Sequence, residues 1–318
     1  MQPFSSFASK KARRNNMFEH LQVWMNGTIV PWNQATVHIM SHGFSRGSAM
    51  FDVFGVHPGP NGPVAFRMDK HLDRLFRSAE LLGMDMAYTR EDIVAAVKEV
   101  VRLNNISRGL IKILAYLGEE AVISLVLDSK LDLAVSGIPA MEDLGLDQAK
   151  PIDICFAKWR KIHPATVPVE AKACSNYLNG MLARKDAVNR GYDVGITLTT
   201  DGQVAEGSIE SMFMVKDGVL KTPPLGNILQ SVTRMSVLEA APAIGIETRE
   251  EPIMPQELME ADEIFVGHTG IKVLPAKKIE GRVLENVPGE VTARISKLMD
   301  DICNCRDDRF KDWVQPLD

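Results

Sequence analysis

The chain has 318 residues, of which 45% are apolar and 24% charged, and its formal net charge is -5. This composition is typical of a globular protein that is long enough for two domains. The negative net charge gives no reason to expect nucleic acid or an anionic membrane as a partner. Because the sequence contains no run of 18 apolar residues, we expect no transmembrane helix. The predicted location is the cytoplasm.

Cysteine usage fits a reducing compartment, because four cysteines in a chain of this length are not a disulfide framework. Cys303 and Cys305 are separated by one residue, but no third or fourth ligand lies nearby, so we expect no metal site. Residues 1–16 contain four basic residues and no acid. Targeting segments share this composition, but the simpler prediction for this stretch is a flexible tail.

Residues 17–136 are predicted to form a small α+β domain. Residues 21–30 read as a hairpin with Asn26-Gly27 at the turn, and a second turn at 59–63 leads into another strand. The remaining strands of this domain are expected at 64–66, 110–117, 122–128 and 131–136.

Two helices are predicted between these strands. Asp69 has the character of an N-cap, and apolar residues then recur at helical spacing until Gly83. Thr89 and Asp92 resemble a capping box that opens a second helix, which extends through Leu103. Two helices packed on an antiparallel sheet give an α+β domain.

Residues 137–151 are predicted to be an interdomain linker, since they contain glycine, prolines and acids without a strong period. A larger second domain is expected at 152–318. Its predicted elements are a strand at 152–157, a helix after Asn176, hairpins at Asp201-Gly202 and Asp217-Gly218, a helix capped by Ser231, a strand at 263–266, a loop at 267–270 and a helix at 290–302.

Three residues of the second domain have side chains suited to chemistry. Lys172 lies between two alanines, and a lysine in apolar surroundings has a lowered pKa and becomes nucleophilic. Glu206 follows a β-like run and precedes Gly207-Ser208, so its carboxylate can reach into a cleft. Tyr177 lies on the first turn of a predicted helix. Taken singly, each also fits an ordinary role: a snorkelling lysine, a turn acid and a packing tyrosine.

Two further segments are suited to holding an anion. Ser231-Val232-Thr233 combines a helix N-terminus with two hydroxyl groups, which favours phosphate. Arg74 lies on the polar face of the helix that follows Asp69, together with His71 and Ser78. A solvated surface is the ordinary interpretation of that face.

Together these segments resemble the fold-type IV pyridoxal-phosphate enzymes of the branched-chain aminotransferase family. The resemblance covers about residues 20–280, and the lysine-to-glutamate spacing of the family is intact. The stretches that carry it are AKACSNYLNGMLARKDAVNRGYD, VAEGSIESMFMVKDGVLKTP, ILQSVTR, ADEIFVGHTGIKVLP, SHGFSRGSAMFD and FRMDKHLDRLFRSA. It implies an α+β fold of two domains. The small N-terminal domain consists of an antiparallel sheet with two helices, and it precedes a larger β-barrel-like α/β domain that binds the cofactor.

The resemblance also implies roles for individual residues. Lys172 resembles the catalytic lysine that forms a Schiff base with pyridoxal 5'-phosphate, and Glu206 resembles the partner of the ring nitrogen. Tyr177 is expected to hydrogen-bond the phenolic oxygen of the ring, and Arg74 to clamp the phosphate. The other implied cofactor contacts are the backbone amides of Val232 and Thr233, the side chain of Leu229 on one face of the ring, and Thr269.

The substrate half departs from the family pattern. Branched-chain-specific members usually have tyrosine where this chain has Arg46, and commonly have tyrosine and arginine where Leu110 and Lys112 stand. Their Gly-Thr-Ala loop is His268-Thr269-Gly270 here, their Glu-Asn pair is Glu210-Ser211, and Val53 and Gly55 replace a glycine and an arginine. The predicted substrate-binding residues are Arg46, Lys112, His268 and Gly270. Arg46 either binds a substrate carboxylate bidentately or lies on the surface.

The resemblance implies an aminotransferase that moves an amino group between a branched-chain or other aliphatic amino acid and a 2-oxo acid such as 2-oxoglutarate, by a ping-pong route. A transaminase of D-amino acids or (R)-amines is the nearest alternative. An aminodeoxychorismate lyase is disfavoured by Val53, where such lyases tend to have threonine. A non-catalytic cofactor-binding protein is disfavoured by the presence of Lys172, Tyr177 and Glu206 together. The family usually forms homodimers, so we expect one here.

Overall fold

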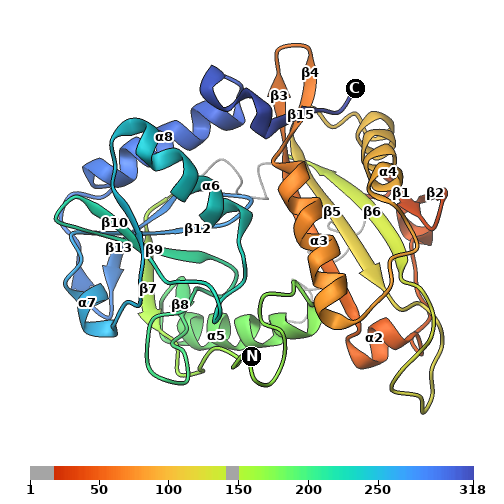
Figure 1. Cartoon of the computed structure of the whole chain (residues 1–318), viewed down its shortest axis with the longest axis horizontal. Coiled ribbons are helices and arrows are strands. Elements are labelled where there is room, and N and C mark those ends of the chain that lie inside the picture. Colours follow the sequence, from red (N-terminus) through yellow and green to blue (C-terminus); the bar gives the residue numbers. More distant parts are fainter. Residues whose placement is uncertain (1–17, 141–149) are drawn as a thin grey trace, which may run out of the picture.

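The computed structural model describes residues 18–140 and 150–318 and shows two α+β domains side by side (Figure 1). The first domain is built on an antiparallel sheet of seven strands in the order β15-β4-β3-β5-β6-β1-β2. The predicted tail and residues 141–149 of the predicted linker lie outside the described residues. The strands are β1 (Gln22–Met25), β2 (Thr28–Pro31), β3 (Ala49–Gly59), β4 (Gly62–Phe66), β5 (Gly109–Tyr116), β6 (Asp132–Pro139) and β15 (Val314–Pro316).

Local sequence signals account for much of this domain. Asn26 and Gly27 have φ values of 49° and 87°, as the predicted β1–β2 turn requires. The helix α4 (Arg90–Leu103) opens with the predicted capping box of Thr89 and Asp92. The helix α3 (Met68–Leu82) differs at its start, because Arg67 in the left-handed conformation precedes it and Asp69 lies inside its first turn. The expectation that Asp69 is the N-cap is therefore wrong.

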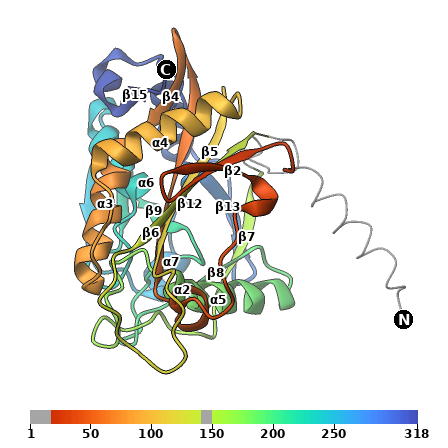
Figure 2. The same cartoon turned by 90° about the vertical axis from the view of Figure 1, so that its right-hand side faces the viewer.

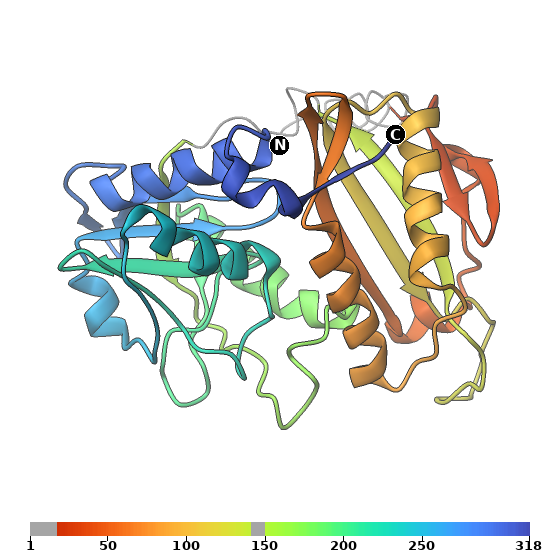
Figure 3. The same ribbon diagram turned by 45° about the horizontal axis from the view of Figure 1, so that its top comes forward.

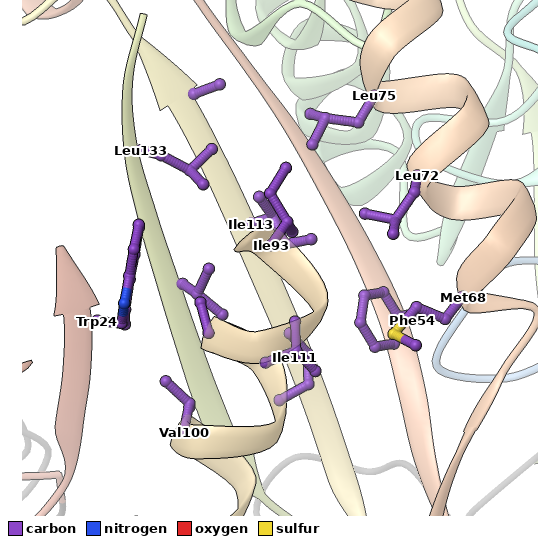
Figure 4. Close-up of a cluster of buried hydrophobic side chains, with 14 of the residues drawn as sticks. Trp24, Phe54, Met68, Leu72, Leu75, Ile93, Val100, Ile111, Ile113 and Leu133 are labelled. Atoms are coloured by element: carbon purple, nitrogen blue, oxygen red, sulfur yellow. The ribbon is translucent and has the colours of Figure 1, made fainter. Parts of the chain in front are cut away.

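The core of the first domain lies between the sheet and the helices α3 and α4. Leu72 and Leu75 of α3 point toward the sheet, where Phe54 lies on β3, while Ile93 and Val100 of α4 lie over the middle strands (Figure 4). All five side chains are fully or almost fully buried. Burial of such apolar side chains stabilises each by about 1.5–3 kcal/mol, so this core sets how α3 is placed against β3.

The strand predicted at 122–128 is absent. After β5 the chain forms only isolated bridges at Glu120 and Leu131 before β6, and Val122, Ile123 and Val126 are 73–88% exposed. The apolar run resembles a strand locally. However, β5, the strand that precedes this run, already has β3 on one side and β6 on the other, so the run cannot pair with it. The β6 strand itself continues through Pro139, into the segment predicted as linker.

The second domain contains a mixed sheet in the order β11-β10-β9-β12-β13-β7-β8, with β14 paired to β13. The predicted Asp217-Gly218 turn joins β9 to β10, and the chain around Asp201-Gly202 doubles back with a bridge between Leu198 and Val204. The strands are β7 (Ile152–Phe156), β8 (Val194–Ile196), β9 (Ser211–Lys216), β10 (Val219–Thr222), β11 (Thr248–Glu250), β12 (Glu263–Gly267), β13 (Leu274–Ile279) and β14 (Arg282–Val283). The helices are α5 (Tyr177–Asn189), α6 (Val232–Ala240), α7 (Pro255–Met259) and α8 (Glu290–Cys303), while α2 (His42–Arg46) belongs to the first domain.

The end of the chain returns to the first domain. From α8 it crosses to β15, which pairs antiparallel with β4, and the C-terminus lies beside β4 (Figures 2 and 3). Residues 314–316 therefore extend the first sheet, although the sequence segmentation assigns all residues from 152 onward to the second domain. The predicted two-domain α+β fold is confirmed. Among the described residues, none of the helices combines the length and apolar character that a membrane crossing requires.

Candidate active site

Lys172 lies at the junction of the two domains. Its backbone N–H donates to Ser78 Oγ of α3 at 3.0 Å, and its carbonyl accepts from the Phe51 N–H of β3 at 3.1 Å. Its Nζ donates to the Tyr177 hydroxyl at 2.6 Å. Burial and the Arg74 cation together lower the pKa of Lys172 to about 7, against the opposing charges of Asp52 and Glu206. About half of the Lys172 amines are therefore neutral at pH 7.

Tyr177 is the first residue of α5, which places its hydroxyl group beside the lysine. Its ring meets Phe51 edge-on, with the ring centroids 4.7 Å apart. Burial raises the pKa of Tyr177 above its ordinary value, so the phenol is neutral and can both donate and accept a hydrogen bond. This hydroxyl accepts from Lys172 and therefore holds the direction of the Lys172 side chain.

A cavity beside Tyr177 contains two further predicted residues of the second domain. Tyr177, Glu206 and Leu229 line it. Glu206 Oε2 accepts the Leu229 N–H at 3.3 Å, while Oε1 forms an ion pair with Lys161. The side chains of this ion pair are only 13% and 14% exposed. The sequence analysis did not find Lys161, because its place depends on a loop that returns beside Glu206 and no local pattern marks it.

The entry of α6 provides the predicted anion cradle. Ser231 Oγ accepts the Arg234 N–H at 3.2 Å, which confirms the predicted cap. Val232 and Thr233 are the first residues of the helix, so their amides have no acceptor within it. Arg74 reaches this helix entry from the other domain, and its Nη1 donates to the Gln230 carbonyl at 3.1 Å. Amides and a guanidinium group at a helix N-terminus favour an anion.

A buried ionic cluster holds Arg74 in place. Asp52 of β3 accepts from Arg74 Nε at 2.9 Å and Nη2 at 2.8 Å, and lies 2.6 Å from His71 Nδ1. Burial raises the pKa of Asp52, but Arg74 and His71 outweigh burial and hold it well below its usual range. His71, Arg74 and Ser78 are all buried. The interpretation of this helix face as solvated surface is therefore wrong, and Asp52 is a residue that the analysis of the sequence missed.

Three of the four predicted substrate residues lie around one point on the first sheet. Thr269 Oγ1 donates to the Val53 carbonyl at 3.1 Å, and Val53 is the register partner of Lys112 on β5. The exposed Lys112 has its Nζ 4.9 Å from the Phe51 ring centroid. The turn that contains His268 and Gly270 therefore docks opposite Lys112.

His268 stabilises that turn, and Arg46 lies apart from it. His268 Nδ1 accepts the Gly270 N–H at 3.1 Å, and burial lowers the pKa of His268 to about 4, so the imidazole is neutral. Arg46 is exposed, and its Nη2 donates to the Val122 carbonyl at 3.1 Å. Within this chain, Arg46 is directed to the 117–131 segment rather than to Lys172.

This donor set fits pyridoxal phosphate. The cofactor needs an amine for its aldehyde, a carboxylate for its ring nitrogen and an anion cradle for its phosphate. Lys172 supplies the amine, Glu206 the carboxylate, and the entry of α6 with Arg74 the cradle. The Ser208 hydroxyl also lines the cavity, buried and without a hydrogen-bond partner among the described residues. No group of three or more His, Cys, Asp or Glu side chains in the described parts of the chain is arranged to hold a metal ion.

Comparisons with known proteins agree with this geometry. Residues 49–279 match the family model for amino-transferase class IV. A branched-chain-amino-acid aminotransferase of Salmonella typhimurium is 32% identical over 93% of this chain and 97% of its own length. The Escherichia coli K12 protein of the same name is 33% identical over 86% of this chain and 90% of its own length.

Solved structures match over almost the whole fold. A branched-chain aminotransferase of Thermoproteus uzoniensis with norvaline has a TM-score of 0.89 and 33% identity, covering 94% of this chain and 99% of that one. The branched-chain amino acid aminotransferase of Thermobaculum terrenum in its PLP form has a TM-score of 0.88 and 28% identity, covering 95% of this chain and 100% of that one. With a lysine, a carboxylate and an anion cradle assembled between its two domains, the chain belongs to the class IV aminotransferases, which are pyridoxal-phosphate-dependent enzymes.

Proposed function

We propose that this aminotransferase moves amino groups between branched-chain or other aliphatic amino acids and a 2-oxo acid such as 2-oxoglutarate. The observation that carries the proposal is the Lys172–Tyr177 pair, whose amine has a pKa near 7 and lies close to the cavity that Glu206 lines. The relatives named branched-chain-amino-acid aminotransferase support the substrate class.

Each residue of the site has a chemical task in this proposal. Lys172, Tyr177, Glu206, Arg74 and the α6 amides hold pyridoxal phosphate, which supplies an electron sink when it is bound. The neutral Lys172 Nζ accepts the α-proton of the amino acid and returns a proton in the reverse half of the cycle. Glu206, ion-paired with Lys161, offers a fixed acceptor for a ring N–H group.

The substrate is oriented by its carboxylate. Lys112 carries the positive charge beside Phe51, and the turn at 268–270 docks on β3 at the register partner of Lys112. A carboxylate held between Lys112 and this turn leaves the apolar side chain of the substrate near Phe51 and Val53. This arrangement favours aliphatic amino acids over charged ones.

The half-reaction tests the proposal. Adding L-leucine to the cofactor-loaded enzyme should discharge the visible absorbance band of the lysine-bound cofactor, and 2-oxoglutarate should restore it. Lys172→Ala should lack the band, whereas Lys277→Ala, which removes a lysine with a 53% exposed side chain, should retain it. If only D-alanine or an (R)-amine discharges the band, the substrate class is wrong. If aminodeoxychorismate yields pyruvate without an amino acceptor, the enzyme is a lyase instead.

We also infer that the enzyme works as a homodimer. Phe44 of α2 and the side chains of Val122, Ile123 and Val126 are 70–88% exposed, and Arg46 ties α2 to this segment through the Val122 carbonyl. An apolar surface of this kind marks a protein interface, and the family relationship favours a second copy as its occupant. Ile123→Asp should shift the mass in light scattering from dimer to monomer, while Val283→Asp, at a 71% exposed position on β14, should not. A dimer that persists in Ile123→Asp would place the interface elsewhere.

A further inference from the structure

A second polar cavity lies at the domain junction, and the aminotransferase site does not use it. It is lined by His57 of β3, by Arg108, by Lys272 and Gly270 from the turn before β13, and by Ser296 and Asn304 at α8. Its volume of about 190 Å³ is many times the ~10–15 Å³ that a cavity needs, on the same measure, to hold one water molecule. The cavity therefore has room for a small ligand.

Lys272 brings a positive charge into this cavity. Its Nζ donates to the Thr269 carbonyl and lies 5.1 Å from the Phe66 ring centroid. Among the described residues, no carboxylate acts on the charge of Lys272. An ammonium group has three N–H donors, and the Thr269 carbonyl takes only one. Burial lowers the pKa of Lys272, which shows that the protein gives this charge little compensation.

His57 adds a second group that needs a partner. Both ring nitrogens are buried and have no hydrogen-bond partner among the described residues, although buried polar atoms are nearly always paired. The imidazole meets the same Phe66 ring edge-on, with centroids 6.5 Å apart, so His57 and Lys272 flank one aromatic floor. Burial, with smaller contributions from the charges of Lys272 and Arg108, lowers the pKa of His57 to about 3. The ring is therefore neutral and presents one N–H donor.

The charges around the cavity indicate whether its ligand is an anion or a cation. Lys272 is a cation, and a bound cation would be repelled by it. The acid in the lining is Asp300, whose carboxylate pairs with Arg306 and accepts from Asn304. The N–H donors of Lys272 and His57 suit the oxygens of an anion, and they disfavour an apolar ligand, which would leave them unpaired.

We propose that this cavity is a binding site for a small oxyanion, a phosphate or a dicarboxylate, held by the Lys272 ammonium and the His57 imidazole with Arg108 at its rim. The site depends on Gly55, because a Cβ at that position would lie 2.6 Å from His57 Nε2 and would displace the ring. An anion here would share Lys272 with the Thr269 carbonyl. The site therefore adjoins the turn that docks opposite Lys112.

The test is a titration of the cofactor-loaded enzyme, so that the anion cradle of α6 is already filled. Inorganic phosphate and malonate, each at constant ionic strength, are titrated by calorimetry, and the tighter of the two identifies the source of the oxyanion. We expect one saturable site per chain that raises the melting temperature. Lys272→Met should weaken it about 10- to 100-fold, as loss of a charge-assisted hydrogen bond does, while Lys277→Met should leave it unchanged.

A second variant keeps the test decisive if Lys272→Met does not fold. Gly55→Ala retains both cations but displaces the His57 ring, so we expect it to weaken the same anion several-fold. The proposal is overturned if neither anion saturates a site on the loaded enzyme. It is equally overturned if Lys272→Met and Gly55→Ala, where they fold, bind as tightly as the native chain.

Discussion

The lowered pKa of Lys172 is the property on which the proposed chemistry rests, and it can be measured without the reaction. The lysine has a pKa of about 7 in the folded chain against an ordinary value of 10.5. At pH 7 about half of its amines are then neutral, compared with roughly one in 3,000 for an ordinary lysine. Burial is the main cause, so the effect belongs to the folded enzyme and should vanish on unfolding.

Competitive labelling of the cofactor-free enzyme measures this difference. Trace acetylation at a series of pH values, followed by peptide mapping, compares Lys172 with the exposed Lys277 in the same sample. Because only the neutral amine reacts, Lys172 labelling should rise through a midpoint near pH 7. In urea the Lys172 midpoint should move toward the ordinary lysine range.

Charge variants identify the electrostatic part of the effect. Lys112 lowers the pKa of Lys172 and Glu206 raises it, so Lys112→Met should move the labelling midpoint upward and Glu206→Gln should move it downward. Neither change should restore an ordinary lysine, since burial remains. A native midpoint near 10.5, or shifts of the opposite sign in the two variants, would refute this account of the site.

Three further predictions concern stability. Asp52→Asn removes the buried charged partner of Arg74 and should lower the free energy of unfolding by about 3–5 kcal/mol, measured by urea unfolding at pH 7. The control is Asp73→Asn, at an exposed site. If both variants are equally stable, the buried cluster does not contribute the expected stability. Ser231→Ala should cost about 1 kcal/mol by loss of the α6 cap, and an unchanged urea midpoint would show that the cap is dispensable. Burial lowers the pKa of His71 from 6.5 to about 4, so the stability present above pH 6.5 should be lost as the pH falls toward 4. His71→Asn should flatten this dependence, and an equally steep native and variant curve would exclude His71 as its source.

Features that depend on neighbouring residues could be predicted from the sequence. The turns at Asn26-Gly27 and Asp217-Gly218, the capping box at Thr89 and the Ser231 cap all follow from backbone preferences and short hydrogen bonds within a few residues. The candidate cofactor residues were also identifiable, because a lysine, a tyrosine and a glutamate keep a family spacing within one continuous stretch of the second domain.

Features that depend on distant residues follow only from the packed chain. The apolar run at 122–128 resembles a strand locally, but both edges of β5 are already taken. The polar face of α3 resembles solvated surface in the sequence, but its Arg74 donates to the buried Asp52 of β3. Lys161 pairs with Glu206, and Lys272 lies with His57 around the Phe66 ring. These contacts, and the pairing of β15 with the first sheet, form only because segments far apart in the chain pack together. Burial and charge pairing are properties of that packing. Local sequence therefore specifies the turns, the caps and the cofactor chemistry, while the three-dimensional arrangement sets which side chains are charged, neutral or without a partner.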